Sequence, residues 1–442
     1  MTIIKSYKSQ NLNGEILIPG DKSISHRALI LSSCAVGRST ISNLLESEDV
    51  YSTLKALKIL GVKIKKNKND WHVYGNGLGS VAGFKGLLNL GNSGTGARLL
   101  MGLISGSDAE ATFTGDESLS KRPMKRVIEP LLQSGSQIVS EDNSLPVTVK
   151  GSKIPLPINF SSNLSSAQVK SAVLISGLTS SGITNYYEPI LSRDHTERML
   201  KFMGAEIETI NFQGKWKISM TGLPSLKNVD FKVPNDPSSA SFPIVSTLIT
   251  PNSKIHIKEV LMNELRIGFI KTLLEMGAKI DVINKKYSNG EKIADLIVNS
   301  SKLNAVDVPA ERSSSMIDEY PILSIAASFA NGTTTFNGVE ELKYKETDRI
   351  IEVVNNLNKL GIKASSTKNK IIITGNNNKV VNGGIEIDSK LDHRIAMSFL
   401  CMGFFSNKPI IINRAQTIQT SFPNFFESMK KIGGNLVKWA KG

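Results

Sequence analysis

The sequence is poor in the residues and patterns that mark several specialised classes of protein. Only two cysteines, Cys34 and Cys401, occur among its 442 residues, too few for a disulfide scaffold or a zinc cluster. Its five histidines lie far apart, and none pairs at the i, i+4 spacing typical of metal sites. No apolar run approaches the ~20 residues of a membrane span, and the N-terminus lacks the pattern of a secretory signal. We therefore expect a cytoplasmic protein without a membrane segment, a metal or a structural disulfide.

The charge of the chain is unbalanced, but aromatic residues are few. The sequence carries 53 Lys and Arg against 39 Asp and Glu, a formal net charge of +14, as some nucleic-acid-binding proteins do. Aromatic residues make up only 6%, and no basic-aromatic alternation suggests a platform for stacking bases. Much of the lysine excess is scattered, as it is on a solvated surface. We expect no nucleic-acid partner and assign the remaining positive charge to a small anionic substrate. Nucleic-acid binding stays an alternative that only the net charge favours.

A helix end recurs six times along the chain. At each place a helical segment reaches a glycine, and a short stretch of alternating apolar and polar residues follows. The glycines are Gly61, Gly135, Gly204, Gly277, Gly361 and Gly433, at intervals of about 70 to 85 residues. Glycine suits the left-handed position just past a helix, and alternation suits a half-buried strand. An earlier, more apolar helix precedes each of them, over residues 26–35, 96–105, 167–178, 240–250, 319–330 and 394–404.

This repeat predicts the architecture. Each copy reads as strand, buried helix, strand, amphipathic helix and further strands, so six copies of one α/β module follow one another. A chain of 442 residues exceeds what one hydrophobic core usually serves. We therefore predict an α/β fold of two domains with three modules each.

Polar and charged residues gather at the starts of these helices. Examples are the segments 21–27 (DKSISHR), 91–98 (GNSGTGAR) and 345–349 (KETDR). A helix N-terminus offers unpaired N–H groups and a partial positive charge, and lysine or arginine beside it completes a phosphate or carboxylate site. The glycine-rich segment 90–96 does not end in Gly-Lys-Ser/Thr, which disfavours a phosphotransferase. His195 and His393, at two further helix starts, are expected to cap helices or to support such sites from behind.

Four of these segments resemble signatures of one known family, the enolpyruvylshikimate-phosphate synthases. They are Pro19–Arg27, Leu90–Thr95, Lys345–Arg349 and Asp392–Met397. The resemblance spans about residues 10–430, and four ordered motifs make it highly specific. It implies two domains of three βαβαββ copies each, joined by two crossovers, the inside-out α/β barrel of enolpyruvyl transferases. That fold agrees with the six modules derived from the repeat.

The resemblance also implies an activity. Enzymes of this family transfer the carboxyvinyl group of phosphoenolpyruvate to the 5-hydroxyl of shikimate 3-phosphate and release phosphate, without a cofactor. We expect these two substrates to be the partners of a monomeric enzyme that is a target of glyphosate.

The family's functional residues carry over onto both predicted domains. Domain I, residues 1–19 and 236–442, is expected to carry phosphoenolpyruvate-side cations and the catalytic Asp; domain II, residues 20–235, is expected to carry the shikimate 3-phosphate side. Residues matching contacts to shikimate 3-phosphate are Lys22, Ser23, Arg27, Ser165, Ser166, Gln168, Arg193 and Lys345. Residues matching contacts to phosphoenolpyruvate are Lys22, Gly94, Arg122, Arg349 and Arg394. Asp318 matches the proposed catalytic base, and Glu346 and Lys22 match candidates for proton transfer.

Three features distinguish this chain within the resemblance. Residues 420–423 read Thr-Ser-Phe-Pro where many relatives have Lys-Thr-Phe-Pro, so a lysine contact to phosphoenolpyruvate is missing. The motifs Arg-Pro-Met at 122–124 and Met-Ile-Asp-Glu-Tyr-Pro at 316–321 look closer to the subgroup called class II. Some glyphosate-tolerant members have alanine where this chain has Gly94, which we expect to leave room for the inhibitor's phosphonate.

The closest alternative is the sister enzyme that transfers enolpyruvate to UDP-N-acetylglucosamine and shares the architecture. It typically uses a cysteine in the loop that here spans Asp116–Arg126, and this loop has none. The comparison favours shikimate 3-phosphate as the acceptor.

Overall fold

A computed structural model describes residues 2–440, and its chain forms two compact units. Unit 1 comprises Met1–Pro19, Pro234–Tyr287 and Lys292–Gly442, and unit 2 comprises Gly20–Val233 and Ser288–Glu291. The chain therefore passes between the units after Pro19 and after Val233, and again on either side of a four-residue segment.

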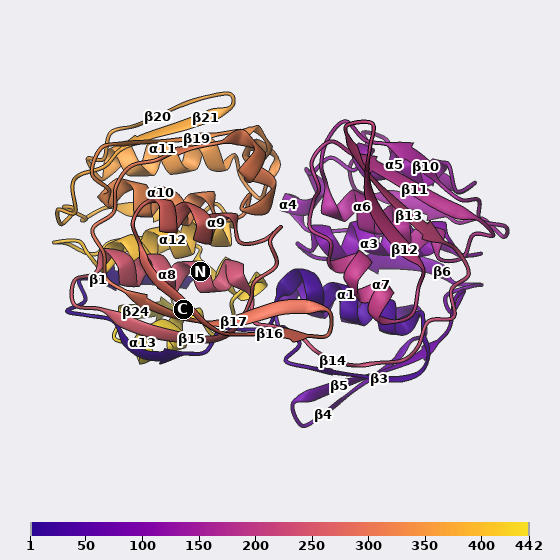
Figure 1. Cartoon of the computed structure of the whole chain (residues 1–442). Helices are drawn as coiled ribbons and strands as arrows, with labels where there is room; N and C mark the ends of the chain where they lie inside the picture. Colours follow the sequence, from indigo (N-terminus) through magenta and orange to yellow (C-terminus); the bar gives the residue numbers. More distant parts are fainter. Residues whose placement is uncertain (1, 441–442) are drawn as a thin grey trace. The chain divides into compact units, whose positions relative to one another are not determined.

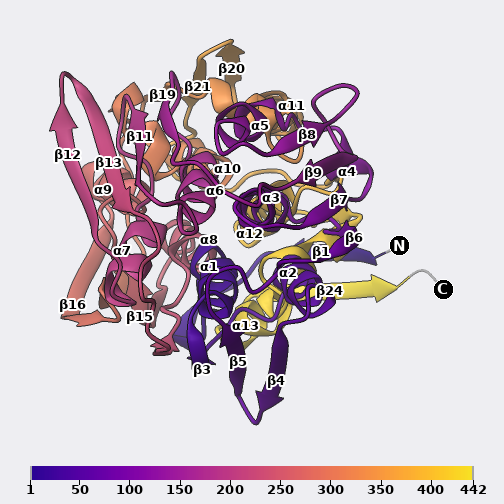
Figure 2. The same ribbon diagram turned by 90° about the vertical axis from the view of Figure 1, so that its right-hand side faces the viewer.

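Unit 2 contains three modules of helices and strands (Figure 1). Its helices are α1 (Lys22–Ser33), α2 (Glu48–Ile59), α3 (Gly94–Ser105), α4 (Glu117–Ser120), α5 (Lys125–Leu132), α6 (Ala167–Gly177) and α7 (His195–Phe202). Its strands are β3 (Val36–Ser42), β4 (Lys63–Asn67), β5 (Asp70–Asn76), β6 (Lys85–Asn89), β7 (Glu110–Thr114), β8 (Gln137–Val139), β9 (Val147–Lys150), β10 (Asn159–Ser161), β11 (Ile183–Glu188), β12 (Ile207–Phe212), β13 (Lys215–Thr221) and β14 (Asp230–Lys232). Figure 2 shows β4–β5 and β12–β13 as two long hairpins of this unit.

Unit 1 contains the other three modules, which the N-terminal strands complete. Its helices are α8 (Pro237–Ile249), α9 (Gly268–Glu275), α10 (Tyr320–Phe329), α11 (Arg349–Lys359), α12 (His393–Gly403) and α13 (Phe425–Lys431), with short 3-10 helices η1 (Ala310–Ser315), η2 (Glu340–Tyr344) and η3 (Ala415–Thr420). Its strands are β1 (Thr2–Tyr7), β2 (Asn13–Ile16), β15 (Lys254–Leu261), β16 (Lys279–Ser288), β17 (Glu291–Asn299), β18 (Asp307–Val308), β19 (Thr333–Asn337), β20 (Ala364–Thr367), β21 (Lys370–Thr374), β22 (Glu386–Asp388), β23 (Ile410–Asn413) and β24 (Asn435–Ala440).

The strands form six four-stranded sheets with one common plan. The orders are β14-β3-β5-β4, β6-β7-β9-β8, β10-β11-β13-β12, β2-β15-β17-β16, β18-β19-β21-β20 and β22-β23-β1-β24. In each sheet the first strand of this order runs parallel to the second. The predicted α/β fold of six like modules is therefore confirmed. Two edge strands are exchanged, since β2 precedes α1 along the chain but pairs with β15, while β14 precedes α8 but pairs with β3.

The predicted helix ends are also confirmed. All six repeat glycines have positive φ, from 80° at Gly361 to 105° at Gly433. A side chain with a Cβ is strained in this left-handed region, which explains why glycine recurs at this position. The amphipathic helix of each module ends two residues before its glycine, or three residues before it in the case of α5.

Apolar helices form the centre of each unit. In unit 1, α8 and α10 are buried along their whole length and pack on each other and on α12 (Figure 1). In unit 2, α3 packs on both α1 and α6. Helices that are apolar on all sides need burial on all sides, and each unit supplies it with an outer layer of sheets. None of the helices within residues 2–440 combines the length and apolar character of a membrane span.

Candidate active site

The first predicted anion site lies at the start of α1. Asp21 caps this helix, and its Oδ1 accepts a hydrogen bond from Ile24 N at 2.8 Å. Lys22 is the first helical residue, and its ammonium group pairs with the buried carboxylate of Asp49 in the first turn of α2. The Lys22 side chain is 19% exposed. The ion pair therefore holds a partly accessible lysine at a helix N-terminus, which favours an anion there.

Arg27, one turn further along α1, is almost fully buried. Its Nε donates to Thr196 Oγ1 of α7 and its Nη2 to Ser171 Oγ of α6, each at 2.7 Å, while its Nη1 donates to Ser23 O at 2.8 Å. Arg27 thus joins three helices whose starts all carry predicted site residues. Direct contact of Arg27 or Ser23 with a substrate stays a prediction.

The second predicted anion site lies around the start of α3, at Gly94. Arg98 Nη1 donates to Gly94 O at 3.2 Å and to Gln168 Oε1 at 2.9 Å. Gln168 Nε2 in turn donates to Thr95 Oγ1 at 3.0 Å. The predicted residues Gly94 and Gln168, from α3 and α6, are therefore brought together. Arg98, which joins them, was not among the predicted site residues, although its i+4 spacing from Gly94 in a motif-bearing segment was a usable signal.

Arg122 approaches the same helix start from the turn between α4 and α5. Its Nη2 donates to Asn92 Oδ1 at 2.7 Å. A methyl group placed on Gly94 would lie 2.9 Å from Arg98 Nη1 and 3.2 Å from Arg122 Nη1. Two guanidinium groups from different elements therefore lie against one glycine, at a place where only a hydrogen atom fits without displacing them.

The start of α6 and the loop before α7 are tied to each other. Ser165 Oγ donates to Ile190 O at 2.5 Å and accepts from Ile190 N at 3.0 Å. Ser166 caps α6, its Oγ accepting from Val169 N at 3.4 Å. Ile190 belongs to the loop of residues 189–194 that also carries Arg193. The predicted Ser165 is therefore bonded to the loop that carries the predicted Arg193.

A buried charge network fixes the same loop. Lys170 Nζ lies 2.9 Å from Glu188 Oε1 and 2.7 Å from Glu197 Oε1, and it donates to Ser192 O at 2.9 Å. Glu188 Oε1 also accepts from Ser192 N at 2.8 Å. Burial acts to lower the pKa of Lys170, but the charges of the two carboxylates raise it above its ordinary value. Ser192, next to Arg193, is thereby anchored to the core of unit 2.

In unit 1 two of the predicted catalytic residues, Asp318 and Glu346, meet around Arg349, the first residue of α11. Asp318 Oδ1 lies 3.5 Å from both Lys345 Nζ and Arg349 Nη1. Arg349 lies 2.6 Å from Glu346 Oε2 through Nη2 and 2.8 Å from Asp392 Oδ2 through Nε. Burial acts to lower the pKa of Arg349, but the surrounding carboxylates, Asp392 foremost, raise it above its ordinary value. The structure therefore brings Asp318, Lys345, Glu346 and Arg349 together, with the Asp318 side chain 21% exposed.

Arg394 lies in the first turn of α12, beside the Asp392 cap of that helix. Its backbone N–H donates to Asp392 Oδ1 at 2.8 Å, and its Nη1 lies 3.9 Å from Glu319 Oε1 and 3.5 Å from Ser238 O. Arg266, which is also buried, donates to Ser238 Oγ at 2.9 Å. No motif surrounds Arg266 in the sequence, so this second cation of the region was missed.

Thr420, where many relatives have lysine, lies at the end of η3. Its Oγ1 donates to Thr417 O at 2.7 Å and lies 3.3 Å from His393 Nδ1. His393 is the first residue of α12. Thr420 is 8% exposed, so this position helps to hold the start of α12 and supplies no charge.

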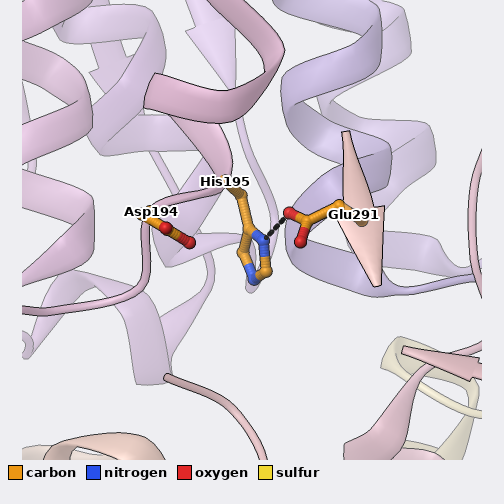
Figure 3. A group of neighbouring side chains, drawn as sticks. All are labelled: Asp194, His195 and Glu291. Carbon is orange, nitrogen blue, oxygen red and sulfur yellow. Dashed lines mark hydrogen bonds and ion pairs between the residues drawn. The ribbon is translucent and has the colours of Figure 1, made fainter. Parts of the chain in front are cut away.

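Within residues 2–440, one group of side chains has the spacing of a metal site: Asp194, His195 and Glu291 (Figure 3). His195 Nδ1 lies 2.7 Å from Glu291 Oε1. Arg198 Nε lies 2.8 Å from Asp194 Oδ2 and 3.6 Å from Glu291 Oε2. A guanidinium group already compensates both carboxylates, and an imidazole N–H already bonds one of them. The group therefore does not fit a metal centre, and His195, the first residue of α7, has a structural partner instead.

Comparison with known proteins identifies the family that this chain resembles. Residues 6–429 match the family model of EPSP synthase (3-phosphoshikimate 1-carboxyvinyltransferase). The 3-phosphoshikimate 1-carboxyvinyltransferase of Methylorubrum extorquens is 45% identical over 432 residues, 96% of this chain and 95% of that protein. The enzyme of Bartonella quintana is 46% identical over 437 residues, 98% and 99% of the two chains. The solved EPSP synthase of Acinetobacter baumannii superposes with a TM-score of 0.88 at 36% identity, covering 100% of both chains.

Proposed function

The chain belongs to the EPSP synthase family, and we propose that the two sets of cationic side chains described above bind the anions of that family's reaction. The activity is that of a 3-phosphoshikimate 1-carboxyvinyltransferase, in the shikimate pathway of aromatic amino acid biosynthesis. The observation that carries the proposal is the concentration of lysine and arginine at helix starts of both units. Both substrates are multiply charged anions, and fixed cations in partly buried surroundings offset their mutual repulsion.

We assign the substrate contacts as follows. Shikimate 3-phosphate is bound by Lys22, Ser23, Arg27, Ser165, Ser166, Gln168, Arg193 and Lys345. Phosphoenolpyruvate is bound by Lys22, Gly94, Arg122, Arg349 and Arg394. Arg98 is added to this set, because it joins Gly94 to Gln168 and lies against the same glycine as Arg122. Arginine suits these positions since its planar donors match a carboxylate or phosphate bidentately.

The proposed reaction is an addition followed by an elimination. The 5-hydroxyl of shikimate 3-phosphate attacks carbon 2 of phosphoenolpyruvate and loses its proton, while carbon 3 gains a proton. The tetrahedral intermediate then releases phosphate by cleavage of the bond between carbon 2 and the phosphate oxygen. Carbon 3 loses a proton as the double bond re-forms. Asp318 accepts the hydroxyl proton, and Glu346 and Lys22 exchange the others. The partly exposed carboxylate of Asp318, 3.5 Å from two cations, supports its role as the base.

Three narrower statements complete the proposal. The Arg-Pro-Met and Met-Ile-Asp-Glu-Tyr-Pro motifs support membership of the class II subgroup. We propose a monomer, which sedimentation or light scattering at micromolar concentration tests directly. The two buried, unpaired cysteines support a cytoplasmic location, where thiols stay reduced.

The decisive experiment measures phosphate release from phosphoenolpyruvate with shikimate 3-phosphate as the acceptor. The matched arm offers UDP-N-acetylglucosamine, and we expect release only with the first acceptor. Variants Arg122→Ala in unit 2 and Arg349→Ala in unit 1 are each expected to raise the KM for phosphoenolpyruvate. Release with the second acceptor alone would overturn the assignment of the substrate, and normal kinetics in both variants would overturn the assignment of the contacts.

A further inference from the structure

A tight hairpin connects β16 to β17, and its tip belongs to a different unit from its strands. Nearly all of both strands lies in unit 1, whereas Ser288–Glu291 form part of unit 2. Asn289 has φ 48° and Gly290 φ 82°. Positive φ at both central residues is the backbone of a tight two-residue turn, and Asn-Gly is the sequence that best tolerates it. The sequence therefore specifies the turn at this tip.

Within unit 2 the tip is fastened to two elements. Asn289 Oδ1 accepts from Lys232 N at 3.1 Å, and Asn289 Nδ2 donates to Asp230 O at 3.2 Å, both on β14. Arg198 of α7 donates from Nη1 to Gly290 O at 3.1 Å. A solvated hairpin would not need these bonds, since its turn is already closed by its own strands. The contacts instead hold the tip against β14 and α7.

The central contact joins Glu291 to His195 (Figure 3). The distance from His195 Nδ1 to Glu291 Oε1 is 2.7 Å, and both residues are at most 2% exposed. A carboxylate can only accept, so Nδ1–H donates to it, which fixes the orientation of the imidazole ring. A charge-assisted bond in such buried surroundings is stronger than a surface pair.

This contact lies two residues from Arg193, a proposed ligand of shikimate 3-phosphate. On one side of Arg193, the backbone at Ser192 is bonded to Glu188 and Lys170. On the other side, His195 is bonded to Glu291. The chain is thus held on both sides of Arg193.

We propose that Glu291 is a positioning residue of the reaction: acting through His195, it fixes the start of α7 so that Arg193 is placed to bind shikimate 3-phosphate. This inference rests on the proposed role of Arg193. It assigns a function to a hairpin tip that no motif of the chain marks, and it separates shikimate 3-phosphate binding, which depends on Glu291, from phosphoenolpyruvate binding, which does not.

The test compares steady-state kinetics of four variants of the full chain. Glu291→Ala removes the acceptor of the His195 bond and is expected to raise the KM for shikimate 3-phosphate about tenfold, with the KM for phosphoenolpyruvate unchanged. Glu291→Gln keeps an acceptor oxygen at the same place and is expected to restore most of the loss. Lys286→Ala, which removes the exposed ion pair between Lys286 of β16 and Glu259 of β15, is the matched control and is expected to behave as the wild type. Arg193→Ala reports on the ligand itself.

The outcomes separate the inference from its premise. If Arg193→Ala leaves the KM for shikimate 3-phosphate unchanged, the role of Arg193 is wrong and the inference falls with it. If Arg193→Ala raises this KM but Glu291→Ala does not, or raises both KM values equally, the positioning role alone is refuted. Should Glu291→Ala fold too poorly to assay, Glu291→Asp, which withdraws the carboxylate from His195 by one methylene, replaces it. The same selective rise is then expected, and its absence overturns the proposal.

Discussion

Substitution of Gly94 by alanine tests how closely the cations of unit 2 surround the start of α3. The added methyl group would lie 2.9 Å from Arg98 Nη1 and 3.2 Å from Arg122 Nη1, shorter than an ordinary contact of roughly 3.5 Å. Both atoms are ends of flexible side chains, so the guanidinium groups move by about half an ångström and the backbone does not. The φ of Gly94 lies outside the left-handed region, and alanine is a good helix former, so the fold is retained.

The expected magnitude follows from the bonds at risk. Arg98 Nη1 bonds Gly94 O and Gln168 Oε1, and displacing it loosens this arrangement as well as the approach of an anion. A hydrogen bond to a charged group contributes about 1.5–3 kcal/mol, and each 1.4 kcal/mol changes affinity tenfold. We therefore expect the KM for phosphoenolpyruvate to rise about tenfold to a hundredfold. The inhibition constant of glyphosate, whose phosphonate is proposed to use the same space, is expected to rise at least as much.

The assay is steady-state phosphate release with each substrate varied in turn, followed by inhibition against phosphoenolpyruvate. The KM for shikimate 3-phosphate and the midpoint of thermal unfolding serve as internal controls, and both are expected to stay near their wild-type values. An unchanged inhibition constant together with an unchanged KM for phosphoenolpyruvate would refute the reasoning. An equal rise in both KM values would show that the methyl group disturbs the whole site and not one subsite.

Three further outcomes are expected from the described contacts. Asp318→Asn keeps the shape of the base but cannot take a proton, so kcat is expected to fall by ~10²–10⁴ while binding of shikimate 3-phosphate in calorimetry is retained; near-normal kcat would contradict its role. Burial, together with neighbouring cations, holds the pKa of His26 well below its usual range. Below pH 6.5 the unfolded state therefore binds a proton that the folded state refuses, and stability is expected to fall as the pH falls, by up to about 1.4 kcal/mol per pH unit, with a shallower dependence in His26→Asn. Burial raises the pKa of Cys34 to about 11 and that of Cys401 to about 12, so a thiol-alkylating reagent is expected to leave the native enzyme active, and rapid inactivation would contradict their burial.

The features that could be predicted from the sequence are local in origin. The six glycines were recognisable because a left-handed residue after a helix restricts the choice of amino acid at a single position. The caps of α1, α3 and α6 were recognisable for the same reason, since a Ser or Asp side chain bonds a backbone N–H three residues away. The cations at these helix starts followed directly, because their motifs lie in the same few residues.

The features that could not be predicted join residues far apart along the chain. Glu291 meets His195 across 96 residues, and nothing near Glu291 in the sequence indicates a partner. The exchange of β2 and β14 between sheets was hidden for the same reason, because each strand has an ordinary pattern and only its pairing is unusual. Arg98 is an intermediate case. Its spacing from Gly94 is visible in the sequence, but its bond to Gln168 depends on the packing of α3 against α6.

The arginines of the site fall into two groups, which differ in their burial and in how many protein groups bond the guanidinium. Arg27 and Arg349 are at most 2% exposed, and their guanidinium groups are bonded to protein groups on three sides, so they hold helix starts in place. Arg122 is only half-buried and lies close to Gly94. Lysine could replace Arg122, because its ammonium group supplies a point charge. Lysine could not replace Arg27 or Arg349, because it cannot make three directed contacts in one plane. Replacement of Arg27 by lysine should therefore lower stability together with activity, whereas Arg122→Lys should lower the affinity for phosphoenolpyruvate and leave the unfolding midpoint in place.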